Sequence, residues 1–339
     1  MKRIIGLDIG GANLKASDGE AQSISIPFPL WKQPERLPEA LAELITRFAA
    51  TDTLAVTMTG ELADCYATKS EGVADILAAV EQAAADTPVG VWQTSGEFVE
   101  PEVAREFWML TAAANWHALA TLAGRIAPTG AALLIDIGST TTDIVPLVDC
   151  LPMPAGRTDL ERLQCGELVY SGVKRTPVCA IAHSVPFGAD HCPLAAELFA
   201  TTHDVYLLTG DIPEDADDTG TADGRPATIE CARDRLTRML CADRSEVSLD
   251  EITDVARFLA DVHRQRLAGA LQRVLRCLPG TCGSVLTSGE GEFLARRLVA
   301  DSPALKDATF LSLAEMLGDE HSQAACAYAL ARLGSERLA

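Results

Sequence analysis

The chain has 339 residues and a formal net charge of −20, from 28 Lys and Arg against 48 Asp and Glu. Hydrophobic residues make up 48% and charged residues 22%, a globular composition that excludes a wholly disordered chain. A surface this acidic argues against nucleic acid and anionic membranes as partners, because proteins bind both of these mainly through basic side chains. No run approaches the roughly 20 apolar residues of a membrane span and no signal peptide is recognised, so we expect a cytoplasmic protein.

The first half of the chain alternates apolar runs with amphipathic segments, which predicts strands and helices in turn. Residues 3–9 are apolar with one Asp and end in Gly10 and Gly11, the pattern of a buried strand entering a turn. Pro128, Thr129 and Gly130 then predict a boundary between a first lobe, 1–128, and a second, 129–339. Between these points, strands are expected at residues 24–28, 54–58 and 89–93, and helices at 36–50, 72–85 and 102–126.

The second half of the chain opens with the same sequence pattern as the first. Residues 131–137 are again apolar with one late Asp and run into a Gly-led polar turn, so one strand–Asp–Gly unit occurs in each half. Strands alternating with helices predict an α/β fold with two lobes. The later elements expected are a helical region at 229–278 with Ser248 as N-cap and Glu251 as its capping-box partner, a strand at 284–287, and a last strand at 310–313.

The first turn carries residues suited to holding phosphate. Gly10 and Gly11 allow the backbone to approach a ligand closely, and their N–H groups can converge on phosphate oxygens. Asp8 is delivered to the end of its strand, where it could hold a divalent metal, and Lys15 could offset phosphate charge. Taken alone, the segment is equally consistent with a tight turn and a solvated Asp.

The second turn repeats the arrangement with more hydroxyl groups. Asp136 precedes Gly138, and Asp143 follows the hydroxyl run. Small hydroxyl residues beside Gly are good phosphate donors, and two Asp can serve as base and metal anchor. The alternative is an Asp- and Thr-rich hairpin turn, but two such turns after buried strands favour a phosphate site. The hydroxyl residues of this turn are Ser139, Thr140, Thr141 and Thr142.

The pair of turns resembles the two phosphate motifs of the actin-like ATPase superfamily, in which two ribonuclease-H-like lobes face a central phosphate-binding cleft. Residues 287–293, where Glu290 separates Gly289 from Gly291, are similar to the Gly-rich segment that this superfamily uses near the nucleotide base. More narrowly, the chain resembles the hydantoinase/oxoprolinase group, in a subfamily described as tetrahydromethanopterin-linked proteins of one-carbon transfer. The segments that carry this narrower resemblance are 57–64, 166–177, 199–206 and 221–226.

The resemblance implies a transferase of methanofuran-type cofactor biosynthesis. It would join a 5-(aminomethyl)-3-furanmethyl diphosphate to the phenol oxygen of γ-glutamyltyramine, forming an ether and releasing diphosphate. Both substrates are small molecules, and self-association is left open. Two alternatives stay open as well: an ATP-dependent kinase or hydantoinase-like amidohydrolase, with Gly289 and Gly291 holding ATP, and a non-catalytic nucleotide-binding protein of the same pathway.

Under this interpretation Mg²⁺ is the expected metal. Its expected ligands are Asp8 and two residues of the Asp-rich loop 210–228, Asp217 and Asp218, because carboxylate oxygens suit this ion. The alternative for the loop is a solvated acidic surface.

The interpretation also assigns catalytic and phosphate-holding groups. The expected catalytic residues are Asp8, Asp136, Asp143 and Lys15, with Asp136 or Asp143 accepting the phenol proton. Lys174 and Arg175 are expected to hold phosphate oxygens.

Three other groups of residues are less informative. Glu61 and Asp64 follow a strand and a Gly, which is consistent with the cleft and equally with a surface loop. The Cys and His residues between 179 and 203 match no structural zinc pattern. The four tryptophans, Trp31, Trp92, Trp108 and Trp116, are interpreted as packing residues.

Overall fold

The computed structural model describes residues 2–49 and 51–338, and its first sheet is built from the N-terminal part of the chain. The strand order is β3-β2-β1-β4-β5-β6, in which β1, β2 and β3 are antiparallel and β4 and β5 run parallel to β1. The strands are β1 (Ile4–Ile9), β2 (Asn13–Ser17), β3 (Ser23–Pro27), β4 (Thr53–Met58), β5 (Val89–Trp92) and β6 (Phe98–Val99). The helices of this part are α1 (Leu37–Thr46), α2 (Lys69–Ala84), α3 (Pro101–Glu106) and α4 (Trp108–Thr111).

The second sheet repeats the first. Its order is β10-β8-β7-β13-β14, again with an antiparallel hairpin, β7–β8, followed by parallel strands. The strands are β7 (Ala131–Ile137), β8 (Thr142–Val148), β9 (Leu151–Pro152), β10 (Leu168–Val169), β13 (Cys282–Ser288) and β14 (Thr309–Ser312). Its helices are α6 (Asp159–Cys165), α10 (Glu292–Ala300), α11 (Leu313–Leu317) and α12 (Asp319–Gln323). The two strand orders confirm the expected two-lobed α/β architecture of ribonuclease-H-like units.

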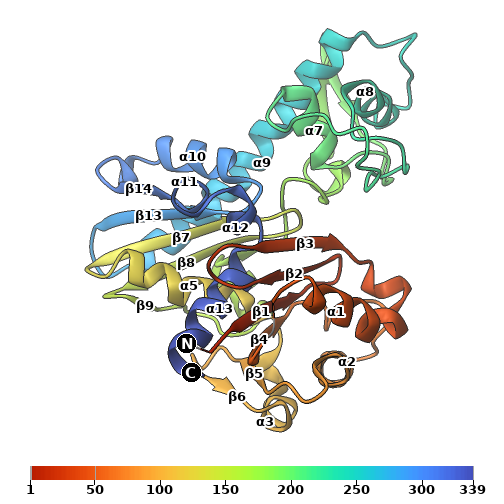
Figure 1. The fold of residues 1–339 in the computed structure, drawn as a ribbon. Helices are drawn as coiled ribbons and strands as arrows, with labels where there is room; N and C mark the ends of the chain where they lie inside the picture. The colour runs from red at the N-terminus through yellow and green to blue at the C-terminus, as the bar shows by residue number, and fades with distance from the viewer. Residues whose placement is uncertain (1, 50, 339) are drawn as a thin grey trace.

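A helical layer lies between the two sheets (Figure 1). It consists of α5 (Asn115–Ile126) and α13 (Ala325–Arg337), whose buried residues belong to the cores of both sheets. Many of these residues are Ala, which lets helix and sheet approach closely. A Cβ at Gly6 would lie 2.0 Å from the carbonyl oxygen of Ala327, so β1 accepts α13 only because Gly6 has no side chain.

This layer bears on the expected boundary after residue 128. The strands of the first sheet come from residues 4–99 and those of the second from 131–312, whereas α13 returns from the end of the chain to pack on β1. The division into lobes 1–128 and 129–339 therefore stays a prediction.

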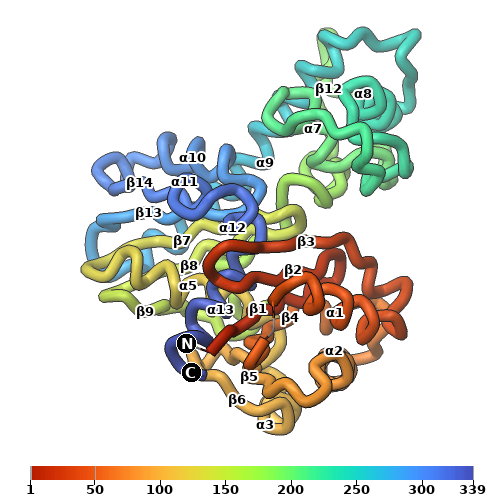
Figure 2. The backbone as a smooth tube through the Cα atoms, in the orientation of Figure 1, coloured from red at the N-terminus to blue at the C-terminus, as the bar shows by residue number. Residues whose placement is uncertain are grey.

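An outer subdomain projects from the second sheet, as the tube in Figure 2 makes plain. Its core is separate from those of the sheets. The expected helical region 229–278 is interrupted here: the chain leaves α8 after Arg238, passes Cys241 at φ 55°, and begins α9 after the N-cap Ser248. The capping box of Ser248 and Glu251 is confirmed. The elements are β11 (Ser184–Phe187), β12 (Asp190–Pro193), α7 (Thr202–Thr209), α8 (Ile229–Arg238) and α9 (Leu249–Cys277).

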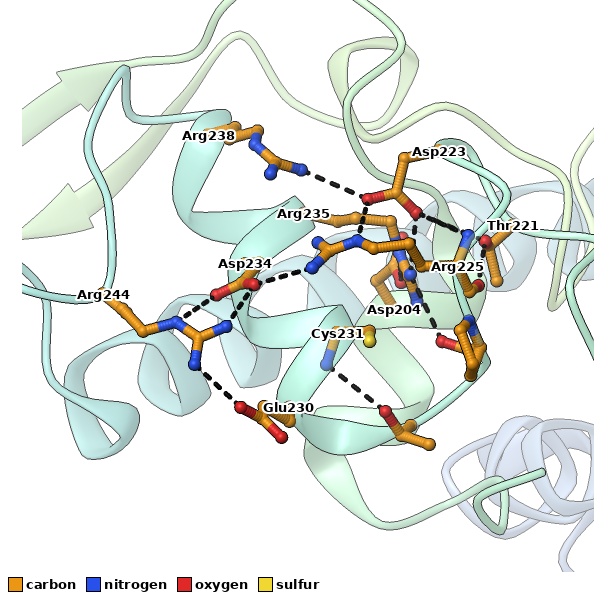
Figure 3. A network of polar contacts seen from close by, with 12 residues as sticks. Asp204, Thr221, Asp223, Arg225, Glu230, Cys231, Asp234, Arg235, Arg238 and Arg244 are labelled. Atoms are coloured by element: carbon orange, nitrogen blue, oxygen red, sulfur yellow. Dashed lines mark hydrogen bonds and ion pairs between the residues drawn. The ribbon is translucent and has the colours of Figure 1, made fainter. Parts of the chain in front are cut away.

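The acidic loop 210–228 packs on this subdomain through arginines (Figure 3). Asp223 accepts hydrogen bonds from Arg225 Nε at 2.7 Å, Arg235 Nη1 at 3.1 Å and Arg238 Nη1 at 3.2 Å. Arg235 is fully buried and also donates to Asp204 at 2.6 Å. Part of the loop's negative charge is thus neutralised within the subdomain. Across residues 2–49 and 51–338, no helix has the length and apolar character to cross a bilayer.

Candidate phosphate-binding cleft

The two Asp-Gly turns open into one cavity of about 580 Å³, a volume typical of small-molecule sites. It lies where the β1–β2 and β7–β8 hairpins end. Of the residues predicted from the sequence, Asp8, Gly10, Gly11, Lys15, Asp136, Gly138, Ser139, Thr140, Thr141, Asp143 and Arg175 line it. Lys174, Gly289, Gly291, Asp217 and Asp218 do not. The structure thus has the convergence that a shared phosphate site requires, while the roles of the residues stay predictions.

The two hairpins are closed in the same way. Gly10 N–H donates to Asn13 O at 3.0 Å, and Gly138 N–H donates to Thr141 O at 2.9 Å. Asp8 lies opposite Lys15 in the strand register, and Asp136 lies opposite Asp143. The two hairpins share a backbone arrangement, but the first pairs an acidic with a basic residue and the second pairs two acidic residues.

Burial dominates the electrostatics of the first hairpin. Asp8 is 5% exposed and its Oδ1 has no hydrogen-bond partner in the described part of the chain. Burial raises the pKa of Asp8, and the opposite Lys15 only partly counters this. Burial by itself lowers the pKa of Lys15, yet Asp8, Asp136 and Glu290 together hold it above the usual value. Lys15 therefore favours its positively charged form at the cavity, opposite Asp8 in the strand register.

The second hairpin needs a cation from outside the hairpin. Burial and the neighbouring Asp143 raise the pKa of Asp136 to about 6. Asp143 is held by Arg162 of α6, whose Nη1 donates to Asp143 Oδ1 at 2.8 Å. Burial still raises the pKa of Asp143, although Arg162 works against it. Arg162 is itself buried, donates to Glu167 O at 3.1 Å, and stacks over the Trp116 ring at 3.9 Å.

A segment behind the second turn fixes its backbone. Val173 N–H donates to Gly138 O at 3.0 Å, and Lys174 and Arg175 N–H groups donate to Ser139 O at 3.0 and 2.9 Å. A Cβ at Gly172 would lie 2.4 Å from Gly138 O, so this contact requires a glycine. The side chains diverge: Lys174 pairs with Glu290 at 2.7 Å, whereas Arg175 reaches over Trp31 at 5.2 Å, at the cavity.

The Gly-rich segment meets the second hairpin from the side of β13. Gly289 adopts φ +88°, and a Cβ there would lie 2.6 Å from Asp136 Oδ1. Gly291 N–H donates to Ile137 O at 2.8 Å. These glycines therefore support the Asp136 strand end, beside the cavity.

The predicted metal ligands divide between the cavity and the outer subdomain. Asp8 lies in the cavity, whereas Asp217 and Asp218 lie in the loop between α7 and α8. The N–H groups of Asp217 and Asp218 donate to Asp215 Oδ1 at 2.9 and 3.3 Å, so Asp215 organises the turn that carries them. The cavity does not bring these two residues together with Asp8.

Sequence reasoning missed several residues of the cavity. Trp31 and Trp116 line it, and Trp116 is also buried in a hydrophobic core, as its interpretation as a packing residue predicted. Arg162 and Asp159 were not identified, and their sequence signal is weak, because only the packing of α6 decides which of its charges face the cleft. Glu61, left undecided from the sequence, lines the cavity and is 1% exposed.

Comparison with known proteins places these features in context. The model of the hydantoinase/oxoprolinase family matches residues 52–333. A protein of Methanocaldococcus jannaschii named "(4-{4-[2-(gamma-L-glutamylamino)ethyl]phenoxymethyl}furan-2-yl)methanamine synthase" is 35% identical over 338 residues, 99% of this chain and 98% of that protein. A protein of Methanococcus vannielii with the same name is 30% identical over 210 residues, 61% of this chain and 91% of that protein. Among solved structures, ROK hexokinase from Thermus thermophilus overlaps with a TM-score of 0.44 at 15% identity, covering 98% of this chain and 99% of its own.

Proposed function

We infer the function of this chain from its family. The chain belongs to the hydantoinase/oxoprolinase family, whose model matches most of its length. We propose that it is a transferase that joins a 5-(aminomethyl)-3-furanmethyl diphosphate to γ-glutamyltyramine, releasing diphosphate. The product is the compound named in the M. jannaschii relative, which aligns over 98% of its own length.

One observation carries the proposal: both Asp-Gly turns and Lys15 line a single cavity. The N–H groups of Gly10 and Gly138 close the hairpins, so a diphosphate placed there would meet the other backbone N–H groups of the two turns and the hydroxyls of Ser139 and Thr140. Lys15 and Arg175 would offset its charge. The furan-methyl carbon would then face the remaining space, where the phenol oxygen of the acceptor can approach it.

The residues of the cavity also fit a divalent cation. Asp8 Oδ1 is buried without a partner, and Asp136 and Asp143 face each other across the second hairpin. Carboxylate oxygens are the ligands that Mg²⁺ takes in proteins. Asp8 and Asp136 would hold the ion, which when bound neutralises charge on a diphosphate leaving group. Lys15, opposite Asp8 in the strand register, would hold phosphate oxygens in place.

The test is product formation. Purified protein is incubated with the furan-methyl diphosphate and γ-glutamyltyramine, with and without Mg²⁺, and the ether is detected by mass spectrometry while free diphosphate is quantified. We expect one diphosphate released for each ether formed, and no need for ATP. Ether formation that requires ATP and releases ADP stoichiometrically, or no ether at all, would contradict the proposal and favour an ATP-dependent reaction of the same cavity.

A further inference from the structure

Glu61 lies on the turn after β4, directly beside the first phosphate turn. Gly60 N–H donates to Ile9 O at 3.0 Å, and a Cβ at Gly60 would lie 3.3 Å from the carbonyl carbon of Gly10. From the other side, α2 packs against the Glu61 backbone, because a Cβ at Gly72 would lie 2.3 Å from Glu61 O. Two glycine contacts therefore hold Glu61 in place at the wall of the cavity.

The Glu61 carboxylate is buried but not satisfied. It is 1% exposed, and its Oε2 has no hydrogen-bond partner within the described residues. Asp8 Oδ1 is likewise without a partner, although Lys15 lies opposite Asp8 in the strand register, whereas Asp143 is held by Arg162. A buried polar oxygen without a donor is costly, so Glu61 is suited to accept a hydrogen bond from a ligand.

The second lobe supplies a comparison. Glu292 follows Gly291 as Glu61 follows Gly60, and both glycines donate to the end of the central strand of their sheet. Glu292 Oε1 accepts from Arg296 at 3.3 Å, its Oε2 is buried without a partner among the described residues, and Glu292 does not line the cavity. Only the first lobe therefore turns this glutamate toward the cavity.

The surroundings of Glu61 bring its carboxyl group close to neutral pH. Burial raises its pKa to about 7, backbone N–H groups of Glu61 and Ala113 and the charge of Lys69 of α2 lower it, and Asp159 of α6 raises it. Lys69 Nζ is engaged by Asp159 Oδ2 at 2.7 Å, so it does not pair with Glu61. The other charged groups of the cavity wall are Asp64 on the same turn, Asp8 of β1, Lys15 of β2, Asp136 of β7, Asp143 of β8, Arg162 of α6, and Arg175.

We propose that Glu61 is the catalytic proton acceptor of the transfer, a role that rests on the proposed function. The C–O bond between the furan-methyl carbon and the diphosphate breaks, and its electron pair leaves with diphosphate. The phenol oxygen forms the new C–O bond to that carbon while its proton passes to the Glu61 carboxylate. Protonated Glu61 then returns the proton to water, so the products are ether, diphosphate and one proton.

Substitution of Glu61 and of the acceptor together tests this role. Glu61→Gln is expected to lower kcat by about 10²- to 10⁴-fold, the usual contribution of a general base. The loss should shrink with ring-fluorinated γ-glutamyltyramines, whose more acidic phenols need less help in losing the proton. Asp75→Asn, which removes an exposed carboxylate from α2 outside the cavity, should leave kcat unchanged.

The wild-type protein gives an independent measurement if the variant folds poorly. Its kcat/KM is expected to rise with pH and level off above about 7, in step with ionisation of Glu61. A rate that is unchanged in Glu61→Gln, or a wild-type rate indifferent to both pH and phenol acidity, would overturn the role of Glu61 alone. Failure of the wild-type protein to form any ether would overturn the proposed function with it.

Discussion

The two hairpins at the cleft share one backbone geometry but differ in the charges that face each other across the strands. In each, the Asp two residues before the turn glycine lies on the central strand of its sheet. Across the first hairpin Asp8 faces Lys15, and across the second Asp136 faces Asp143. Like charges directly opposite each other in a sheet are destabilising, whereas opposite charges stabilise it. The first hairpin is therefore balanced within itself, and the second depends on a cation from elsewhere.

Arg162 supplies that cation from α6, and its position links local chain geometry to the site. Thr158 and Glu161 form a capping box that fixes the start of α6, and Arg162 follows within the first turn. The guanidinium carbon of Arg162 then lies 3.9 Å from the centroid of the Trp116 ring, which lines the cavity. A repeated backbone motif thus keeps its geometry while its charge balance comes from an unrelated element.

The largest expected effect comes from removing this external cation. Arg162→Leu leaves Asp143 buried without a partner, next to Asp136, and should lower the free energy of unfolding by about 3–5 kcal/mol. Urea unfolding followed by circular dichroism measures the change. The exposed Arg257, which pairs with the exposed Asp254, is the matched control, and Arg257→Leu should cost less than about 0.5 kcal/mol. Equal losses in the two variants would remove the distinction between the hairpins.

A double mutant sharpens the same point. If the loss in Arg162→Leu arises from the stranded Asp143 charge, Asp143→Asn should restore much of it in the combined variant. Strict additivity of the two substitutions would instead assign the loss to the packing of Arg162 on Trp116.

The next effect concerns the internal cation of the first hairpin. Lys15→Met removes the cation opposite Asp8 at the cavity, and we expect KM for the diphosphate substrate to rise about 10- to 100-fold, the worth of one charge-assisted hydrogen bond. Steady-state kinetics of ether formation measures it. Lys306→Met, which alters an exposed lysine, is the control. An unchanged KM in Lys15→Met would place the diphosphate away from the first hairpin.

The smallest effect is a gain in stability with a defined pH dependence. The pKa of Asp136 is raised to about 6 in the folded protein, so its ionisation disfavours folding as the pH rises through about 6. Asp136→Asn should therefore stabilise the protein by about 1–2 kcal/mol at pH 8 and hardly at all at pH 4. Urea unfolding at both pH values tests this, with the exposed Asp307→Asn as control. An equal change in the free energy of unfolding at both pH values would contradict the raised pKa of Asp136.

Local patterns predicted much of this fold. The two strand–Asp–Gly units, the Ser248 capping box and most strands follow from apolar periodicity and turn residues, which act over a few neighbouring positions. The meeting of the Asp8 and Asp136 turns followed from a resemblance between motifs. Arg162 could not be found in this way, because its partner Asp143 lies on another element and only tertiary packing brings them together.

The acidic loop illustrates a different limit. Its Asp residues predicted a metal site or a solvated surface, and the structure pairs Asp223 with Arg225, Arg235 and Arg238 instead. Those arginines lie close by in the sequence, so a count of nearby basic residues would have signalled such pairing. Asp217 and Asp218 remain predicted metal ligands, with Asp215 holding their backbone.

The helical layer between the sheets has a consequence for how the chain is made. One face of β1 is covered by α13, and Lys2 Nζ reaches Leu338 O at 3.0 Å, so a strand of the first sheet is completed by a helix that follows both sheets in the sequence. Domains usually fold from the N-terminus as they leave the ribosome. Here that side of the first sheet would stay uncovered until α13 has emerged, so the cleft assembles only after both lobes have been made.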